Sequence, residues 1–310
     1  MIILNINFYK IKNKLNLQSF YKFDNLKMSK EQDNWTLVIK PRRSLFDINL
    51  KAVWEYRDLI ALFVRRDFVA KYKQTILGPL WFLIQPLLIT LMFTVVFGNI
   101  AGISTDGLPK MLFYMSGITA WNYFAESFKA TSNTFVTNAA IFGKVYFPRL
   151  ALPISTVISG LIQFVIQFLF LIAFMIYFGL AGANFSPNIY VLLIPVLIIL
   201  MAGLGLGMGI IISSLTTKYR DLTNLVGFGV QLFMYATPVI YPVSSLPEKY
   251  QMIILANPIT PIIETFRFAL LGTGTVSPLH LLYSFGFMIV VLFFGIILFN
   301  KIEQSFMDTV

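Results

Sequence analysis

Long apolar runs separated by short polar breaks fill the chain from about residue 80 onward. A helix that crosses a membrane needs about 20 mainly apolar residues, because the hydrocarbon core is ~30 Å thick. Six stretches meet or approach this length, and we predict a transmembrane helix in each. They are residues 80–98, 111–131, two spans within the charge-free stretch 150–217, 222–241 and 279–300. The sequence GLAGANFSPN (179–188) is rich in turn-forming residues and is predicted to connect the two spans of the charge-free stretch.

The segment between the last two predicted spans is apolar but repeatedly interrupted. It holds two predicted helices, SLPEKYQMIILAN and PITPIIETFRFALLG, each too short to cross a bilayer. The interruptions are Asn257, Pro258 and Pro261, and the charged residues among them are Glu248, Lys249, Glu264 and Arg267. Irregular backbone at membrane depth is tolerated only against protein or a water-filled cavity. We therefore expect a re-entrant helical hairpin over 243–277 that dips in from the outer face. The alternative is a loop lying on the lipid surface.

Before the first span, the stretch EYRDLIALFVRRDFVAKYKQTILGP has the pattern of an amphipathic helix at the membrane surface. Its apolar face consists of Leu59, Ile60, Leu62, Phe63 and Val64, and its charged residues Arg57, Asp58 and Arg65 face away. Arg66 and Asp67 interrupt the pattern before Phe68 resumes it, so we expect a bend near Arg66. Gly78-Pro79 then turns the chain into the first span, since proline is well tolerated at the start of a helix.

The composition and the charge distribution are those of a membrane protein. Of 310 residues, 57% are hydrophobic and 12% are charged, and a soluble protein carries about twice that charged share. The net charge of +10 does not indicate a nucleic acid partner, because 15 of the 24 Lys and Arg residues precede Gly78. With the N-terminus inside, the predicted cytoplasmic segments hold 21 of these 24 residues and the outer loops hold 3. The positive-inside rule therefore predicts that both termini are cytoplasmic.

The chain divides into four predicted segments. The first residues lack an apolar run long enough for a signal peptide, and Met28 opens a more ordinary beginning than Met1. Residues 1–27 are therefore interpreted as a disordered tail or as preceding the true start. The segments are a tail expected to be disordered (1–45), the interfacial helix region (46–78), the six-span domain (79–300) and a cytoplasmic tail (301–310).

Motifs for catalysis, nucleotide binding or metal binding are absent from the sequence. It has no G-x-x-x-x-G-K-[ST] loop, no H-E-x-x-H pair, no G-x-S-x-G turn and no cysteine. The one histidine, His280, is interpreted as an interfacial residue. We therefore expect a protein that is not an enzyme and holds no metal or cofactor. Glu126 is the best candidate for ion coupling, but pairing with Lys129 one turn along the helix is the favoured interpretation.

The sequence GLGLGMG (203–209) contains two overlapping G-x-x-x-G steps. Such glycines let two helices approach closely. Packing within the subunit is favoured here over a seam between two copies or a flexible point beside a pore.

Five stretches carry a family resemblance: RRDFVAKYKQTILGPLWFLIQPLL (65–88), NAAIFGKVYFPRLALP (138–153), KYRDLTNLVGFGVQ (218–231), TPVIYPVSSLPEKYQ (237–251) and NPITPIIETFRFALLG (257–272). Together they resemble the membrane subunit of the ABC type-2 exporters of cell-surface polysaccharide, which carry lipid-linked O-antigen, capsule or wall teichoic acid. The resemblance covers about residues 45–300, and it is specific in combination although no single stretch is a catalytic signature.

The resemblance implies two membrane subunits, a homodimer, in the bacterial inner membrane with two copies of a separate ATPase that binds ATP and Mg²⁺. In that family the loop after the second span carries a coupling helix that docks on the ATPase, and residues 138–146 match it. The coupling residues implied are Asn138, Ile141, Phe142, Lys144, Val145 and Tyr146, with a second contact at Arg220 and Asp221. From composition alone, a basic loop that anchors the topology is an equally good interpretation.

The resemblance also implies a pore between the two copies that passes a lipid-linked glycan. Candidate rings for stacking against sugars are Trp81, Tyr114, Trp121, Tyr123 and Phe124, although a membrane-interface belt is the commoner use of Trp and Tyr. Candidate cations for an anionic diphosphate headgroup are Arg65, Arg66 and Lys71, which positive-inside anchoring explains nearly as well. Pro258, Pro261, Glu264 and Arg267 fall in the family's outer hairpin. The alternatives are an exporter of a drug or small lipid with the same fold and a scaffold without transport.

Overall fold

The computed structural model describes residues 50–306 apart from residues 74, 143–146 and 220, and every regular element in this part of the chain is helical. The α-helices are α2 (Leu50–Glu55), α3 (Arg57–Tyr72), α4 (Trp81–Phe93), α5 (Lys110–Ser132), α6 (Thr134–Phe142), α7 (Ala151–Leu180), α8 (Ile194–Thr216), α9 (Leu222–Tyr235), α10 (Glu248–Leu255), α11 (Thr260–Leu271) and α12 (Pro278–Phe306). Shorter 3-10 turns are η1 (Gly78–Leu80), η3 (Ile189–Leu193) and η4 (Val243–Ser245), and α4 continues as a π-helix, η2 (Thr94–Ile100). The predicted tail over residues 1–45 lies outside the described residues.

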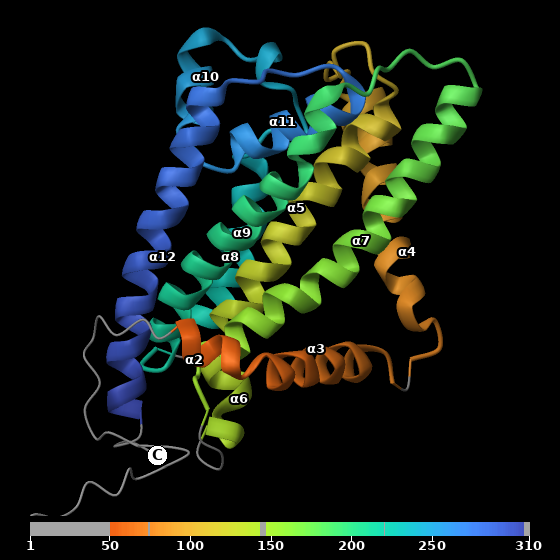
Figure 1. Ribbon diagram of the computed structural model, residues 1–310. Helices are drawn as coiled ribbons and strands as arrows, with labels where there is room; N and C mark the ends of the chain where they lie inside the picture. The colour runs from red at the N-terminus through yellow and green to blue at the C-terminus, as the bar shows by residue number, and fades with distance from the viewer. Residues whose placement is uncertain (1–49, 74, 143–146, 220, 307–310) are drawn as a thin grey trace, which may run out of the picture. The chain divides into compact units, whose positions relative to one another are not determined.

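The long helices α5, α7, α8 and α12 run side by side, and the shorter helices gather at their two ends (Figure 1). Helix α3 lies across one end of this bundle, where α6 also projects, and we call this the α3 end (Figure 1). Helices α10 and α11 lie at the opposite end, which we call the α11 end (Figure 1). The predicted surface-lying orientation of the helix before the first span therefore agrees with the arrangement of α3.

Four helices are long and apolar enough to cross a membrane: Gly78–Ile100, Ala151–Leu180, Ile189–Thr216 and Pro278–Ile302. They coincide with four of the six predicted spans, and the predicted turn lies between the second and third of them. The bent pair α10 and α11 would add a fifth span if it were counted as one. The two other predicted spans are helical but fall short of the same criterion, so the count of six is confirmed only in part.

The fifth predicted span, 222–241, is too long by several residues. Helix α9 ends at Tyr235 and has 14 residues, which gives it a length of about 21 Å. Its end is explained by Pro238, because proline disfavours a helical conformation in the residue before it and cannot donate a backbone hydrogen bond.

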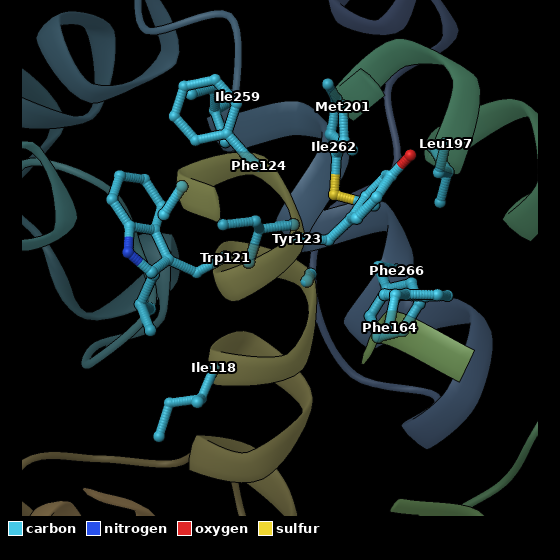
Figure 2. Close-up of a cluster of buried hydrophobic side chains, with 14 of the residues drawn as sticks. Ile118, Trp121, Tyr123, Phe124, Phe164, Leu197, Met201, Ile259, Ile262 and Phe266 are labelled. Carbon is cyan, nitrogen blue, oxygen red and sulfur yellow. The ribbon is translucent and has the colours of Figure 1, made fainter. Parts of the chain in front are cut away.

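The second predicted span, α5, has the length of a span but carries many polar residues. It occupies the centre of the apolar core, with side chains pointing to several sides of the helix (Figure 2). Trp121 and Phe124 contact Phe233 of α9, and Tyr123 contacts Phe164 of α7. Because α5 is covered by other helices, it does not need the apolar surface that contact with lipid demands.

The predicted turn between α7 and α8 is tied to the end of α11. The amide of Ser186 donates to the carbonyl of Leu271 at 3.2 Å, and the amide of Asn188 donates to the carbonyl of Ala269 at 3.1 Å. The side chain of Asn188 donates to the carbonyl of Phe268 at 2.9 Å. The last carbonyls of a helix have no partner within it, so this turn satisfies the end of α11 and fixes its position.

The glycines of α8 allow close contact with two different helices. A Cβ atom on Gly203 or Gly207 would meet α12, where Met288, Val291 and Leu292 lie. A Cβ atom on Gly205 would lie 2.8 Å from Cβ of Ser127 on α5, and one on Gly209 would also meet α5. The two G-x-x-x-G steps therefore pack α8 against two helices at once, and the interpretation of packing within the subunit is confirmed.

We expect Gly205→Ala to destabilise the protein by roughly 1–3 kcal/mol, the usual cost of overpacking a tight contact. The added methyl group would also lie 3.2 Å from the carbonyl oxygen of Phe124, and backbone cannot move aside as a flexible side chain can. Gly286→Ala is the matched control, because no atom lies within 4 Å of a Cβ atom there. The midpoint of thermal unfolding in detergent should fall for Gly205→Ala alone. An equal change in both variants would contradict the close-packing explanation.

Candidate functional site: a polar cleft at the α3 end

Two adjoining cavities form a polar cleft near α3. The larger, of about 440 Å³, is lined by residues of α3, α5, α6 and α7 and by Phe82 of α4. The smaller, of about 370 Å³, is lined mainly by α4 and α5, with Gln163 of α7 and Lys71 of α3. Lys71, Phe82 and Glu126 line both cavities. These three residues therefore form the boundary between the two halves of one cleft.

An ion pair joins α3 to the central helix at this boundary. The ammonium group of Lys71 donates to a carboxylate oxygen of Glu126, and the two side chains are 50% and 32% exposed. At that exposure the net stabilisation is expected to be small, about 0–1 kcal/mol. The sequence interpretation paired Glu126 with Lys129. In the structure its ion-pair partner is Lys71 of α3, so the expected pairing within α5 is wrong although Glu126 does form an ion pair.

Arg66 lines the larger cavity and does not mark a bend. Its guanidinium group donates to Asp67 at 2.7 and 2.9 Å and to Asn138 of α6 at 3.4 Å. It also lies 4.8 Å from the ring of Phe63. Helix α3 runs without interruption from Arg57 to Tyr72, so the predicted bend near Arg66 is wrong. The apolar pattern stops there because the helix meets a polar cleft.

The predicted apolar face of α3 is only partly packed against the subunit. Ile60 and Phe63 are buried, whereas Leu62 is 59% exposed. Of the three cations predicted to meet a headgroup, Arg66 and Lys71 line the larger cavity. Arg65 is exposed and is not among the residues that line it.

The predicted coupling helix lies only partly within the described residues. Helix α6 begins at Thr134, earlier than expected, and has a non-helical backbone at Asn138. Asn138 and Phe142 are buried within the subunit, whereas Ile141 is half-buried. Asp221 is exposed at the start of α9. Lys144, Val145, Tyr146 and Arg220 lie outside the described residues.

Four of the five predicted glycan-stacking rings are buried in the core. Tyr114, Trp121, Tyr123 and Phe124 of α5 are each 0–3% exposed. In this structure they pack the subunit and offer no surface to a passing polymer. Trp81, at the start of α4, is 48% exposed and lines the smaller cavity. The sequence alone could not distinguish the buried rings from the exposed one, because it does not show which sides of α5 are covered by other helices.

The predicted hairpin is a bent pair of helices at the α11 end. Helices α10 and α11 meet at 101° across the break that contains Pro258. The side-chain oxygen of Asn257 accepts from the amide of Ile259 at 3.0 Å, and Pro261 lies in the first turn of α11. All residues of α11 except Phe268 are buried. For α11, the alternative of a loop lying on the lipid surface is therefore wrong.

A buried ion pair anchors the hairpin to the bundle. Arg267 donates to Glu264 at 2.9 Å, and the two side chains are 1% and 2% exposed. The guanidinium group also donates to the carbonyl of Pro238 at 2.9 Å and lies 3.9 Å from the ring of Phe113 on α5. The second carboxylate oxygen of Glu264 accepts from the amide of Thr275 at 3.4 Å. Each charge is thus paired and has further hydrogen bonds, as a buried pair requires, although the Nε of Arg267 has no hydrogen-bond partner among the described residues.

The four long apolar helices, together with α3 lying across one end of the bundle, define a multi-pass membrane protein. Residues 58–271 match the ABC-2 type transporter family, and the chain belongs to it. The chain is similar to the O-antigen export system permease protein RfbA of Klebsiella pneumoniae, at 29% identity over 254 residues that cover 81% of this chain and 94% of the relative. It is also similar to the protein of the same description from Myxococcus xanthus, at 24% identity over 70% of this chain and 82% of the relative. The polysialic acid transport protein KpsM of Escherichia coli is 23% identical over 80% of this chain and 95% of the relative.

The family assignment confirms the resemblance seen in the sequence. Members are transmembrane subunits without an ATPase domain of their own, so the family implies a separate ATPase partner for this chain. The matched region begins within α3 and ends with α11. It therefore includes both the polar cleft and the buried ion pair of the hairpin.

We expect Arg267→Met to destabilise the subunit by roughly 3–5 kcal/mol, because it leaves the carboxylate of Glu264 buried without its cation. The double variant Glu264→Gln with Arg267→Met removes both charges and should recover much of this loss. Lys249→Met removes an exposed cation of the same hairpin and should have little effect. Thermal unfolding in detergent measures all three variants. A double variant no more stable than the single one would show that the unpaired charge is not the cause.

Proposed function

We propose that this chain is the membrane subunit of an ATP-driven exporter that moves polysaccharide linked to a polyprenyl diphosphate out of the cytoplasm. The observation that carries the proposal is the cleft at the α3 end, where the cationic side chains of Arg66 and Lys71 line a cavity of about 440 Å³. The relatives named above, permeases for O-antigen and a transporter of polysialic acid, support a glycan as cargo.

The chemistry of the cleft suits a diphosphate headgroup. Arg66 and Lys71 are held by the carboxylates of Asp67 and Glu126. The oxygens of a diphosphate are ligands of the same kind and carry more negative charge. In the bound state they would take the places of the Asp67 and Glu126 carboxylates beside Arg66 and Lys71. The exchange is accessible because both pairs are partly solvated, so neither pair is strongly held. Each lysine or arginine near an anionic lipid surface adds roughly 1 kcal/mol of attraction.

The proposal places the α3 end and both termini on the cytoplasmic side of a bacterial inner membrane. The support is the distribution of Lys and Arg residues, 15 of which precede Gly78. Two copies of this chain would pair with two copies of the ATPase, which would hold ATP and Mg²⁺. The same orientation puts the hairpin of α10 and α11 at the outer face.

The coupling contact is proposed for the α6 region. Helix α6 projects beyond α3 at this end (Figure 1), where a cytoplasmic ATPase would approach. Asn138 and Phe142 are already packed in the subunit, so the contact is assigned chiefly to Ile141, Lys144, Val145 and Tyr146. Asp221, with Arg220 beside it in sequence, would add a smaller contact.

Reversing a charge in the coupling segment should release the ATPase. We expect Lys144→Glu combined with Tyr146→Ala to reduce co-purification of the ATPase more than tenfold, since like charges brought together at an interface cost several kcal/mol. Lys249→Glu is the matched charge reversal at the α11 end and should leave the complex intact. Normal recovery of the complex and normal export in the double variant would contradict the coupling assignment.

Removing the cations of the cleft should slow export. Loss of about 1 kcal/mol from each of Arg66 and Lys71 predicts at least a tenfold lower rate for Arg66→Gln combined with Lys71→Gln. Arg65→Gln is the control, since this residue lies on the same helix but outside the cavity lining. The measurements are surface glycan and lipid-linked glycan retained inside the cell, in a deletion strain that expresses each variant. A deletion strain with normal surface glycan that instead accumulates a small hydrophobic compound would favour a drug or lipid cargo.

A further inference from the structure

The smaller cavity has a lining that a diphosphate does not need. Beside the shared ion pair and the cation Lys129, it presents three side-chain amides and one indole ring, from Gln85, Asn122, Gln163 and Trp81. A diphosphate carries only acceptor oxygens and is matched by cations. Amides carry both donors and acceptors without charge, which is the pattern that matches hydroxyl groups.

Three helices bring these groups together. Trp81 and Gln85 are four residues apart on α4 and therefore share one side of that helix, as do Asn122 and Glu126 on α5. Gln163 reaches the same cavity from α7. The amide group of Asn122 donates to Gln167 at 3.3 Å, and Gln167 in turn donates to the carbonyl of Phe82 at 3.2 Å. Asn122 is thus held in place.

Two of the amides have no partner of their own. Within the part of the chain that the structure describes, no hydrogen bond is made by the side chain of Gln85 or Gln163. Both residues lie within long apolar helices, where a polar side chain is costly to keep unless it binds water or a ligand. A membrane-interface belt would explain Trp81, but it would not require amides on three helices around it.

We propose that the smaller cavity is a subsite for the sugar residue next to the diphosphate. This inference rests on the proposed function and adds the part of the substrate that is recognised. The half-exposed ring of Trp81 would stack on the apolar face of a pyranose. Gln85, Asn122 and Gln163 would bind its hydroxyl groups, and Glu126 would accept a further hydrogen bond once Lys71 turns to the phosphate.

The order of the two cavities matches the order of the groups in the substrate. Lys71 and Glu126 line both cavities. A diphosphate in the larger cavity would therefore place its attached sugar beside Glu126, at the entrance to the smaller one. Separation of Glu126 from Lys71 would make both side chains available in one step. Lys71 could then bind the phosphate, and the carboxylate of Glu126 could accept hydrogen bonds from the sugar hydroxyl groups.

The test is a comparison of binding constants for probes with and without a sugar. The full-length protein, purified with its ATPase, is titrated with polyprenyl diphosphates that carry one glucose, one galactose, one N-acetylglucosamine or no sugar. We expect at least one sugar-bearing probe to bind about tenfold more tightly than the sugar-free probe. Gln85→Leu combined with Gln163→Leu should reduce this ratio to about one and leave the affinity for the sugar-free probe within twofold. These substitutions break no hydrogen bond within the described structure, so the fold is retained.

Further variants test whether Trp81 contributes by stacking and whether loss of any exposed amide would have the same effect. Trp81→Ala should lower the ratio and Trp81→Phe should largely preserve it, because a second aromatic ring can still stack. Gln231→Leu is the control, an exposed amide on α9 that does not line the cavity. Equal binding of all four probes to the native protein would overturn the sugar subsite while leaving the diphosphate proposal intact. An equal loss of affinity for every probe in the double variant would also overturn it. Binding of none of the probes would overturn the proposed function together with this inference.

Discussion

Helix α5 carries serine, threonine, asparagine, glutamate and lysine side chains through a region where lipid cannot solvate them, and the arrangement of the other helices follows from that constraint. Polar groups at membrane depth need partners from protein or from a water-filled cavity. Helices α7, α8, α9 and α11 cover α5 with aromatic and aliphatic side chains. The glycines of α8 allow the covering to be close, since a side chain at Gly205 or Gly209 would collide with α5.

The polar cleft lies where this covering is incomplete. Near the α3 end Asn122, Glu126 and Lys129 of α5 face outward, and α3 and α4 surround them without closing the space. The amides and cations of the neighbouring helices then supply the polar partners that lipid cannot. In a transporter subunit the cleft is a place where a charged, hydroxyl-rich molecule can be held at the membrane surface.

Two of the ion pairs among the described residues differ in how firmly their charges are held. The pair of Glu264 and Arg267 is enclosed and has additional hydrogen bonds, so separating its charges would expose each to an apolar surrounding. It suits a fixed anchor for the hairpin. The pair of Lys71 and Glu126 is partly solvated, so either charge can change partner at a modest cost in free energy. It suits a contact that opens when substrate binds. The fixed pair lies at the α11 end and the exchangeable pair at the α3 end.

The sequence by itself determined the features that depend on neighbouring residues along the chain. Apolar length predicted four of the spans, the Gly, Asn and Pro residues of 179–188 predicted the turn, and Pro258 with Pro261 predicted the break in the hairpin. Only the tertiary structure decided which residues meet across the chain. It gave Glu126 a lysine from α3 rather than its neighbour on α5, buried Tyr123 while leaving Trp81 exposed, and joined Arg66 to a cleft where the sequence predicted a bend. Periodicity and composition are local properties of a helix, whereas burial and ion pairing depend on which helix lies beside it, and that is fixed by packing among segments far apart in the sequence.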